Sequence, residues 1–220
     1  MVAPGSNCPL CRESAAQFYH RDKFRSYYQC ARCALVFVPP AYFLSPAEEK
    51  DYYDLHENAL EDDGYRRFLN RCAQPLVSIL PDGARGLDFG CGPAPLLAKI
   101  LEEQGCKVSL YDHFYQPDTG VFSAQYDFVV STEVIEHLWD PRSVLERLWD
   151  SIRPGGVLAL MTKLVLSKER FASWHYIRDP THIVFFSEST FHWFAEYLGA
   201  RLEFPAADVI FLHKPVSVPR

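Results

Sequence analysis

Four of the seven cysteines form two Cys-x-x-Cys pairs near the N-terminus, at Cys8, Cys11, Cys30 and Cys33. Each pair can present two thiolates to one metal ion, and two such pairs supply the four sulfur ligands of a tetrahedral structural Zn²⁺ site. Four sulfur ligands leave no open position on the metal for catalysis. We therefore predict a zinc ribbon that either stabilises the fold or recognises a substrate or partner, and the sequence leaves both roles open.

A glycine-rich turn follows an apolar segment and carries Asp88, Gly90, Cys91 and Gly92. Glycines at such a turn let the backbone approach a ligand and expose N–H groups to it. Asp112 ends the next apolar segment, where its carboxylate could accept hydrogen bonds from both hydroxyls of a ribose. Pro95 occupies the position of the third glycine in the dinucleotide-binding motif, which argues against NAD as the ligand.

Polar and aromatic side chains are concentrated between Trp174 and His182. A loop of this kind, placed after a strand, is where doubly wound folds build substrate pockets. An imidazole in such a pocket can remove a proton from a nucleophile. His175 and His182 are therefore candidate catalytic bases, with His137 as a third; a purely structural loop is the alternative.

The alternation of apolar and helical segments after Arg85 predicts an α/β fold with a doubly wound, mostly parallel sheet. Strands are predicted at 86–89, 107–111, 126–130, 157–162 and 209–213, and helices at 96–104, 142–152 and 188–198. The segment from His113 to Gln125 is too short for the helix and strand that normally lie there, because a parallel crossover needs about a dozen residues or more. We predict an abridged sheet edge with at most one short strand and no complete helix.

The charge is distributed unevenly along the chain. The net charge is −6 overall, +3 over residues 1–45 and −9 over the remainder. We predict a zinc-ribbon module over 1–45, a helical lead-in or lid over 46–80 and the α/β domain over 81–220. An acidic chain does not depend on long-range attraction to nucleic acid or anionic membranes, and no apolar stretch is long enough to span a bilayer. We therefore expect a cytoplasmic protein.

Four segments, 87–95, Asp112, 126–138 and 153–156, resemble in this order the successive motifs of class I S-adenosylmethionine-dependent methyltransferases. The likeness is strongest to the bacterial group that includes the ubiquinone-biosynthesis O-methyltransferases, and many bacterial members also carry a four-cysteine ribbon ahead of the domain. The resemblance implies a Rossmann-like methyltransferase fold and S-adenosylmethionine as the cofactor.

The resemblance also implies roles for single residues. Asp88, Gly90, Cys91 and Gly92 would surround the methionine part of the cofactor, Asp112 would hold the ribose, and His113 and Phe114 would border the adenine. Thr132 and Glu133 would lie beside the sulfonium. Small-RNA 2′-O-methyltransferases and ubiquinone O-methyltransferases have a similar Glu-x-x-Glu-His that binds a divalent ion, which here corresponds to Glu133, Glu136 and His137. Alternatively, Glu133 faces the cofactor and His137 packs against the sheet.

We predict an enzyme that methylates oxygen, nitrogen or carbon of a small molecule, either a metabolite or a carrier-bound sugar. Tyr52, Tyr53 and His56 of the lead-in are expected to close over the methyl group together with the 174–182 loop. An RNA methyltransferase whose basic ribbon holds RNA is the alternative, although the acidic remainder of the chain opposes it. A non-catalytic cofactor-binding or interaction protein is a third reading.

Overall fold

The computed structural model describes residues 7–14, 16–54 and 63–216, and its larger part is a six-stranded sheet with the order β5-β4-β6-β7-β10-β9. The strands are β4 Arg85–Phe89, β5 Lys107–Tyr111, β6 Tyr126–Thr132, β7 Ile152–Met161, β9 Arg201–Ala206 and β10 Val209–His213. The first four strands in the sheet order are parallel, whereas β10 pairs antiparallel with both β7 and β9. The predicted doubly wound, mostly parallel sheet is confirmed.

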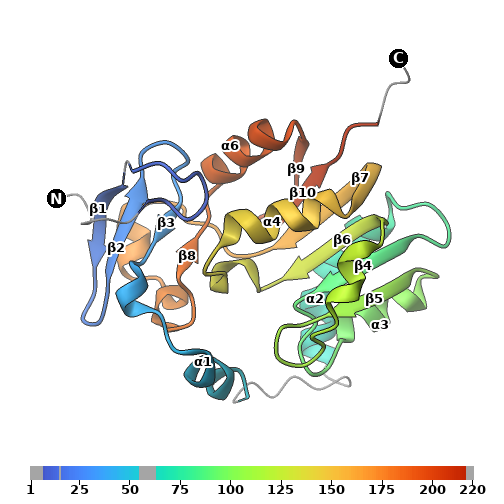
Figure 1. Ribbon diagram of the computed structural model, residues 1–220, viewed down its shortest axis with the longest axis horizontal. Helices are drawn as coiled ribbons and strands as arrows, with labels where there is room; N and C mark the ends of the chain where they lie inside the picture. The colour runs from blue at the N-terminus through green and yellow to red at the C-terminus, as the bar shows by residue number, and fades with distance from the viewer. Residues whose placement is uncertain (1–6, 15, 55–62, 217–220) are drawn as a thin grey trace.

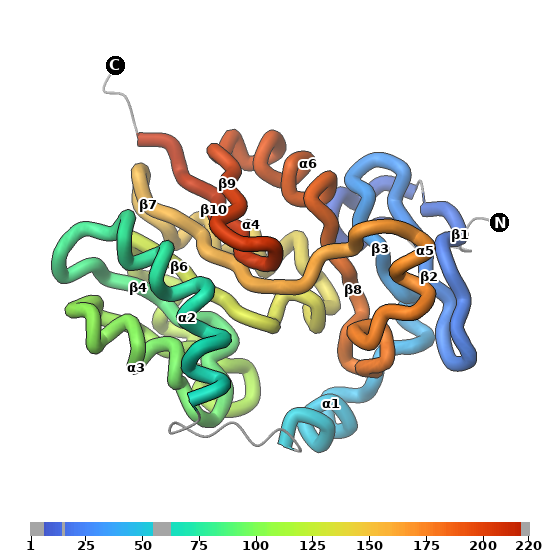
Figure 2. Tube along the Cα trace, turned by 180° about the vertical axis from the view of Figure 1, so that it is seen from behind, coloured from blue at the N-terminus to red at the C-terminus, as the bar shows by residue number. Residues whose placement is uncertain are grey.

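Helices cover both faces of this sheet (Figures 1 and 2). α2 (Asp63–Val77) and α3 (Leu96–Glu103) lie on one face, and α4 (Pro141–Asp150) and α6 (Glu188–Leu198) lie on the other. Neighbouring side chains of a strand point to opposite faces, so a strand covered on both sides is apolar throughout. In β6, Phe128 and Val130 pack with α2 and α3, whereas Val129 packs with α4 and α6.

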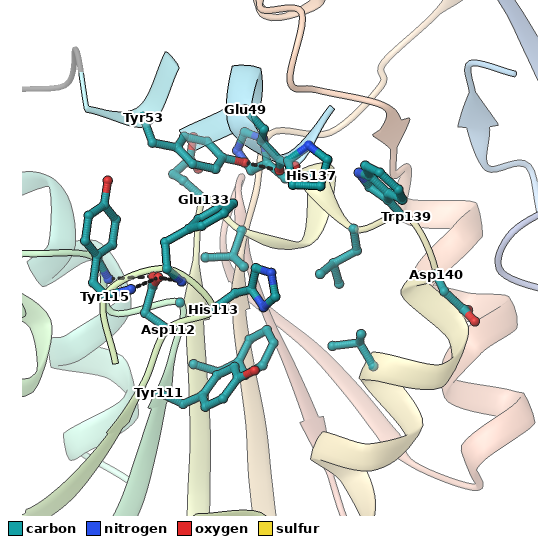
Figure 3. Close-up of a pocket in the computed structure, with 18 residues that line it drawn as sticks. Glu49, Tyr53, Tyr111, Asp112, His113, Tyr115, Glu133, His137, Trp139 and Asp140 are labelled. Carbon is teal, nitrogen blue, oxygen red and sulfur yellow. Dashed lines mark hydrogen bonds between the residues drawn. The ribbon is translucent and has the colours of Figure 1, made fainter. Parts of the chain in front are cut away.

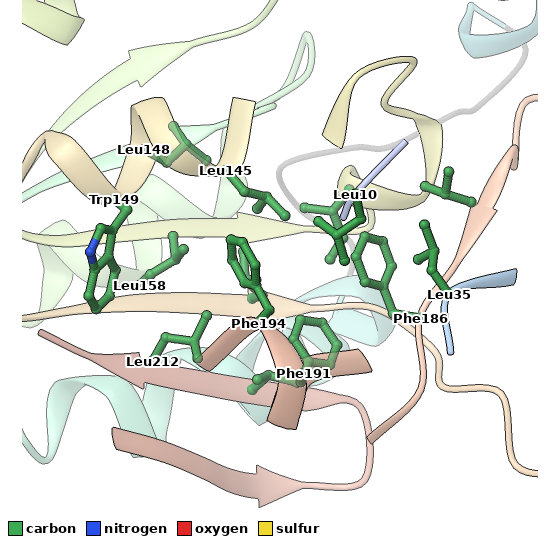
Figure 4. Packing of buried hydrophobic residues seen from close by; sticks show 14 of the residues in the cluster. Leu10, Leu35, Leu145, Leu148, Trp149, Leu158, Phe186, Phe191, Phe194 and Leu212 are labelled. Atoms are coloured by element: carbon green, nitrogen blue, oxygen red, sulfur yellow. The ribbon is translucent and has the colours of Figure 1, made fainter. Parts of the chain in front are cut away.

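The core on the α4 and α6 side is built from large apolar side chains (Figure 4). Leu145 and Leu148 of α4 and Phe191 and Phe194 of α6 are buried over the sheet, where they belong to one cluster with Leu158 of β7. This cluster extends to the cysteine-containing N-terminal part, because Leu10 and Leu35 are members of it. The N-terminal part and the α/β part therefore share one hydrophobic core.

The connection from β5 to β6 is abridged, as predicted. It contains the short 3₁₀ helix η2 (Thr119–Ser123), and among the described residues it holds no α-helix and no strand. The boundaries around β7 differ from the prediction: α4 ends at Asp150, and β7 begins at Ile152 because that residue pairs with Tyr126. The antiparallel strand β9 was not predicted.

A second sheet has four strands in the order β1-β2-β3-β8. The first three are β1 (Ala16–Arg21), β2 (Ser26–Cys30) and β3 (Val36–Phe37) of the N-terminal part, and β3 pairs with β8 (Val184–Phe185). β8 belongs to the connection between β7 and α6, which also contains α5 (Lys168–Ala172) and the 3₁₀ helix η4 (His175–Arg178). This sheet combines strands of the predicted zinc-ribbon module with β8 from the predicted α/β domain. The predicted division of the chain at residues 45 and 80 therefore stays a prediction.

α1 (Pro46–Tyr53) follows the ribbon and the 3₁₀ helix η1 (Pro40–Tyr42). It starts with a capping box, in which Ser45 Oγ accepts from the Glu48 N–H and the Glu48 carboxylate accepts from the Ser45 N–H. α2 runs through Pro75 to Val77. None of the helices in the described ranges is both long enough and apolar enough to cross a membrane.

Candidate functional site

The carboxyl ends of β4, β5 and β6 surround a cavity of about 460 Å³ (Figure 3). Its walls combine aromatic, acidic and small residues: Pro46, Glu49, Tyr53, Phe89, Gly90, Gly92, Tyr111, Asp112, His113, Phe114, Tyr115, Glu133, Val134, His137, Leu138, Trp139, Asp140 and Val144. Ligands of open α/β sheets bind outside the carboxyl ends of the strands. The cavity therefore lies where the fold predicts a ligand site.

The glycine turn after β4 forms part of the wall. Gly90 and Gly92 have positive φ angles of 80° and 64°, a conformation that favours glycine. A Cβ on Gly90 would lie 2.3 Å from Val134 Cγ2, whereas a Cβ on Gly92 would meet no atom within 4 Å. Gly92 is thus a bare stretch of backbone that faces open space, where a ligand can approach closely.

The N–H groups of this turn are used within the protein. Gly90 and Cys91 both donate to the Tyr111 carbonyl, at 2.7 and 3.2 Å, and Gly92 donates to Asp112 Oδ2 at 3.0 Å. The expectation that these donors face a ligand is therefore not met. The turn therefore lets a ligand come close to its backbone but does not offer it these N–H groups as hydrogen-bond donors.

Asp112 is the main organiser of this wall. Besides Gly92, its Oδ1 accepts from the N–H groups of Phe114 and Tyr115, at 2.8 and 3.1 Å. A carboxylate offers about four acceptor positions, so roughly one remains for a ligand hydroxyl. The predicted capture of both ribose hydroxyls by Asp112 would need one of the backbone donors to be released.

Two carboxyl groups near the turn keep a buried oxygen without a partner, Asp88 Oδ2 and Glu133 Oε1. Burial raises the pKa of Asp88 to about 7, and burial together with the nearby Glu136 raises the pKa of Glu133 to about 8. Glu133 also has a positive φ of 53°, which is strained for a residue with a side chain. Unpartnered buried oxygens and backbone strain of this kind concentrate at functional sites.

His137 lies at the cavity wall opposite Tyr111 (Figure 3). Its Nδ1 donates to the Thr181 carbonyl at 3.2 Å, because a carbonyl oxygen can only accept, and Nε2 therefore carries the lone pair. Desolvation lowers the pKa of His137 to about 4, so the imidazole is neutral near pH 7. A neutral imidazole with a free Nε2 can accept a proton or bind a metal ion.

A buried polar cluster lies behind His137. Glu136 is fully buried and accepts from Thr162 Oγ1 at 3.0 Å and from the Tyr176 hydroxyl. His182 Nδ1 donates to the Tyr176 carbonyl at 2.8 Å, and its ring centroid lies 4.7 Å from that of His137. One ligand atom each of Glu136, His137 and His182 lies within 4.8 Å of the others.

This grouping differs from the predicted Glu133, Glu136 and His137. Glu133 precedes the 3₁₀ helix η3 (Ile135–His137) with a left-handed backbone, so the three residues do not share the face of one α-helix. Among the described residues, His182 from the distant loop takes the place of Glu133 in the converging group.

α1 covers one side of the cavity. Tyr53 donates to Glu49 Oε1 at 2.9 Å, and its ring contacts those of His137 and Phe114 with centroid distances of 5.3 and 5.8 Å (Figure 3). Tyr115 donates to Asp54 Oδ1 at 2.6 Å and so ties the end of α1 to the loop after β5. Tyr53 thus lies where the lid was predicted, and the predicted lid residue His56 lies outside the described residues.

Five of the other predicted site residues do not line the cavity. His175 is exposed, and its Nε2 lies 3.2 Å from Lys163 Nζ. Asp88, Cys91, Thr132 and His182 pack behind the walls and do not line the cavity. Seven predicted residues do line it: Gly90, Gly92, Asp112, His113, Phe114, Glu133 and His137.

The wall residues that sequence reasoning missed include Glu49 and Trp139. Glu49 and Tyr53 stand four residues apart in α1, a spacing that puts both on one helix face and was the available signal. Trp139 follows η3 in an irregular segment, and no sequence pattern marks it.

The four N-terminal cysteines converge as predicted for a metal centre. The sulfurs of Cys8 and Cys33 lie 3.5 Å apart and those of Cys11 and Cys30 lie 3.3 Å apart, and all four sulfurs lie within 4.8 Å of one another. Thiolates 2.3 Å from a tetrahedral Zn²⁺ lie about 3.8 Å apart, so small adjustments complete the coordination. The cluster suggests a zinc ribbon.

The comparisons with known proteins agree on one family. The family model described as a methyltransferase domain matches residues 57–203. The malonyl-[acyl-carrier protein] O-methyltransferase of Enterobacter lignolyticus is 30% identical over an alignment of 134 residues, gaps included, that covers 51% of this chain and 53% of that protein. The ubiquinone biosynthesis O-methyltransferase of Erwinia tasmaniensis is 31% identical over 87 residues, 39% of this chain and 36% of that protein. The chain thus spans about half, or less, of the length of these relatives.

Two solved structures share the fold. The 1,6-didemethyltoxoflavin-N1-methyltransferase of Burkholderia thailandensis, with bound 1,6-didemethyltoxoflavin and S-adenosylhomocysteine, matches with a TM-score of 0.50 and 16% identity over 91% of this chain and all (100%) of that one. DesVI of Streptomyces venezuelae matches with a TM-score of 0.51 and 15% identity over 79% of this chain and 99% of that one. At these identities the likeness is one of fold.

Proposed function

The chain belongs to the methyltransferase-domain family, and from that premise we propose that it is an S-adenosylmethionine-dependent methyltransferase that acts on a small molecule. The observation that carries the proposal is the cavity at the carboxyl ends of β4, β5 and β6, with the bare Gly92 backbone and the Asp112 carboxylate in its wall. The family resemblance of the glycine turn and of Asp112 supports the same ligand.

The wall chemistry fits this cofactor. Four carboxyl groups line the cavity, those of Glu49, Asp112, Glu133 and Asp140, and the described lining residues include no lysine or arginine. The carboxylates of such a wall would stabilise a positive sulfonium, and the bound cation would in turn lower the raised pKa of Glu133 and favour its charged form. A bound cation would give the unpartnered Glu133 Oε1 a partner, and a ligand packed against Gly92 would fill the open space there.

Residue roles follow from the positions in the wall. Asp112 accepts one ribose hydroxyl, Gly92 contacts the methionine part, and His113 and Phe114 border the adenine. Glu133 faces the sulfonium. Asp88, Cys91 and Thr132 support the turn and the end of β6 from behind. When bound, S-adenosylmethionine supplies an electrophilic methyl group that a nucleophile can displace.

His137 is the proposed base, in preference to His175 and His182, because it lines the cavity and they do not. Its Nε2 accepts the proton that an oxygen or nitrogen nucleophile gives up, while Nδ1–H stays bound to the Thr181 carbonyl. Tyr53 excludes water from one side of the cavity. A divalent ion held by Glu136, His137 and His182 is the alternative use of the same groups, since an ion can also lower the pKa of a hydroxyl.

The lining supports a neutral or cationic acceptor. Tyr53 and Trp139 offer flat apolar surface beside Glu49, and no cation is present in the described wall to meet a phosphate. RNA recognition would need such cations. The acidic wall therefore favours a small molecule over the RNA alternative.

We also propose that Cys8, Cys11, Cys30 and Cys33 hold one structural Zn²⁺. Four thiolates would complete the coordination, so this ion stabilises the N-terminal part and takes no part in methyl transfer. The support is the convergence of the sulfurs and the burial of three of the four cysteines.

The test of the proposed function measures methyl transfer and cofactor binding separately. Protein with radiolabelled S-adenosylmethionine is incubated with a metabolite extract or with total RNA, and we expect label in the small-molecule fraction. His137→Gln should lower turnover by on the order of 10²–10⁴ while cofactor affinity is retained. The exposed His192 of α6 provides the control variant, His192→Gln, which should leave both unchanged.

Three outcomes would contradict the proposal. Label that enters RNA alone would favour the RNA alternative. Calorimetry without detectable S-adenosylmethionine binding would remove the cofactor assignment. An unchanged rate in His137→Gln would remove His137 as the base.

A further inference from the structure

Arg25, in the turn directly before β2, is a charged residue with an unusual environment. Its side chain is 7% exposed, and it lies in the N-terminal part that contains the cysteines. Buried arginines are rare unless their donors are satisfied, because the charge must be stripped of water. The partners of its guanidinium therefore indicate what this residue does.

Those partners are the carbonyl groups of the loop that carries His182. Nη2 donates to the carbonyls of Ile177 and Asp179, at 2.7 and 2.9 Å, and Nη1 donates to those of Pro180 and His182, at 3.0 and 2.9 Å. Nε donates to the Tyr27 hydroxyl at 3.2 Å. A guanidinium has five N–H groups, so all five are accounted for. Four of the five bonds organise the backbone of one short segment.

Tyr27 and Asp22 hold the arginine in place. The Tyr27 hydroxyl donates to Asp22 Oδ2 at 2.6 Å, and Asp22 Oδ1 accepts from the Arg25 N–H at 2.6 Å. The β1–β2 turn thus forms a rigid support for the guanidinium, and the support is part of the sheet that β8 completes on its far side.

The Thr181 carbonyl, which Arg25 does not bind, contacts His137 instead. Thr181 lies between Pro180 and His182, and its carbonyl accepts from His137 Nδ1 at 3.2 Å. Arg25 Nη1 binds the two flanking carbonyls, so it fixes the backbone on both sides of the one group that orients His137. The Thr181 N–H and hydroxyl are fixed as well, since both donate to Asp179 Oδ1.

We propose that Arg25 is a positioning residue that acts through the Thr181 carbonyl to hold His137 as the Nδ1–H tautomer, which leaves the lone pair on Nε2. The proposal rests on the proposed function for the meaning of a free Nε2, and the tautomer itself is measured without any methyl transfer. In this proposal the N-terminal part shapes the site through His137, without binding an acceptor or contacting the cofactor itself.

The test compares Arg25→Lys with Arg21→Lys in the full-length protein. Lysine keeps the charge but carries its three donors on one nitrogen, which cannot span four carbonyls. Arg21 is exposed at the end of β1 and serves as the matched control. The tautomer of His137 is read from the ¹⁵N shifts and couplings of the imidazoles, assigned with His137→Gln.

In the wild type and in Arg21→Lys we expect the Nδ1–H pattern for His137. In Arg25→Lys this pattern should give way to Nε2–H or to a mixture, while the metal content and the cofactor dissociation constant change by less than about twofold. Once an acceptor is known, kcat should fall by on the order of 10–100 with the cofactor affinity retained.

Folded Arg25→Lys with an unchanged Nδ1–H pattern would overturn the proposal, even if methyl transfer is confirmed. If Arg25→Lys does not fold, Tyr27→Phe decides, because it removes the hydroxyl that accepts from Arg25 Nε and contacts Asp22 and the Ile177 carbonyl, while the guanidinium and its four carbonyl partners stay in the chain. A partial shift of His137 toward Nε2–H in Tyr27→Phe supports the proposal, and an unshifted pattern contradicts it.

Discussion

Replacement of Gly92 by alanine should separate cofactor binding from folding more sharply than any other single change. The residue has a φ of 64°, and a Cβ built on it meets no protein atom within 4 Å. The added methyl group would therefore strain the backbone and project into the cavity without displacing any part of the protein.

The two effects have different sizes. A positive φ costs an alanine about 1–2 kcal/mol, and the loss of glycine freedom in the unfolded chain offsets about 0.4–1 kcal/mol of this. The net loss of unfolding free energy is about 1 kcal/mol, which lowers Tm by about 2–4 °C in a chain of this size. If the cofactor lies against Gly92, the methyl group blocks the contact, and affinity should fall at least about tenfold, or 1.4 kcal/mol.

Gly83 provides the matched control. Its φ is 68°, a Cβ there also meets no atom within 4 Å, and it precedes β4 at the end of the strand that is remote from the cavity. Gly83→Ala and Gly92→Ala should therefore show similar Tm values by differential scanning fluorimetry. Calorimetry with S-adenosylmethionine should show weak binding for Gly92→Ala alone. Equal affinities in the two variants would refute the placement of the cofactor against this turn.

Three further predictions concern the metal, the buried cluster and the pH dependence. Protein purified without added metal should contain about one equivalent of zinc, which Cys33→Ser should lower together with Tm; less than about half an equivalent by metal analysis would argue against the site. Tyr176→Phe removes a donor from the buried Glu136 carboxylate and should cost about 1.5–3 kcal/mol in urea unfolding, whereas Tyr197→Phe, at an exposed pair, should cost less than about 1 kcal/mol; equal losses would discount the cluster. Burial raises the pKa of Asp88 to about 7, so between the unfolded-state value and 7 the folded state binds more protons, and stability falls as the pH rises. In urea unfolding, the free energy of unfolding of the wild type should decrease from pH 5 to pH 8 by about 3 kcal/mol more than that of Asp88→Asn. An identical decrease in both proteins would disprove the buried titration.

The elements with strong periodic patterns could be predicted from the sequence. β5, α6 and β10 begin and end at the predicted residues, because each is an apolar or amphipathic run with clear flanking residues. The abridged connection after β5 was predictable from chain length alone. β9 was not, since its register depends on pairing with β10 rather than on a pattern of its own.

The site was predictable where motifs are local and failed where distant segments meet. Asp112 and the glycine turn are marked by neighbouring residues, so their positions in the cavity wall follow from the sequence. The approach of His182 to His137 depends on the loop geometry that Arg25 holds from the other end of the chain, and no local pattern encodes it. No local pattern predicts the exposure of His175, the second residue of the polar run that ends at His182.

The pairing of β3 with β8 has a consequence for the order of events during synthesis. The four cysteines leave the ribosome before the α/β part, so a metal ion can organise the N-terminal part while the α/β part is still to be made. The partner strand of Val36 and Phe37, however, is Val184–Phe185, which is made about 150 residues later. Until then β3 is an open strand edge, and unpaired edges are templates for other chains. Chains arrested before β8 would therefore carry an incomplete sheet, even with the proposed zinc bound, and the edge of that sheet is where nascent copies would associate.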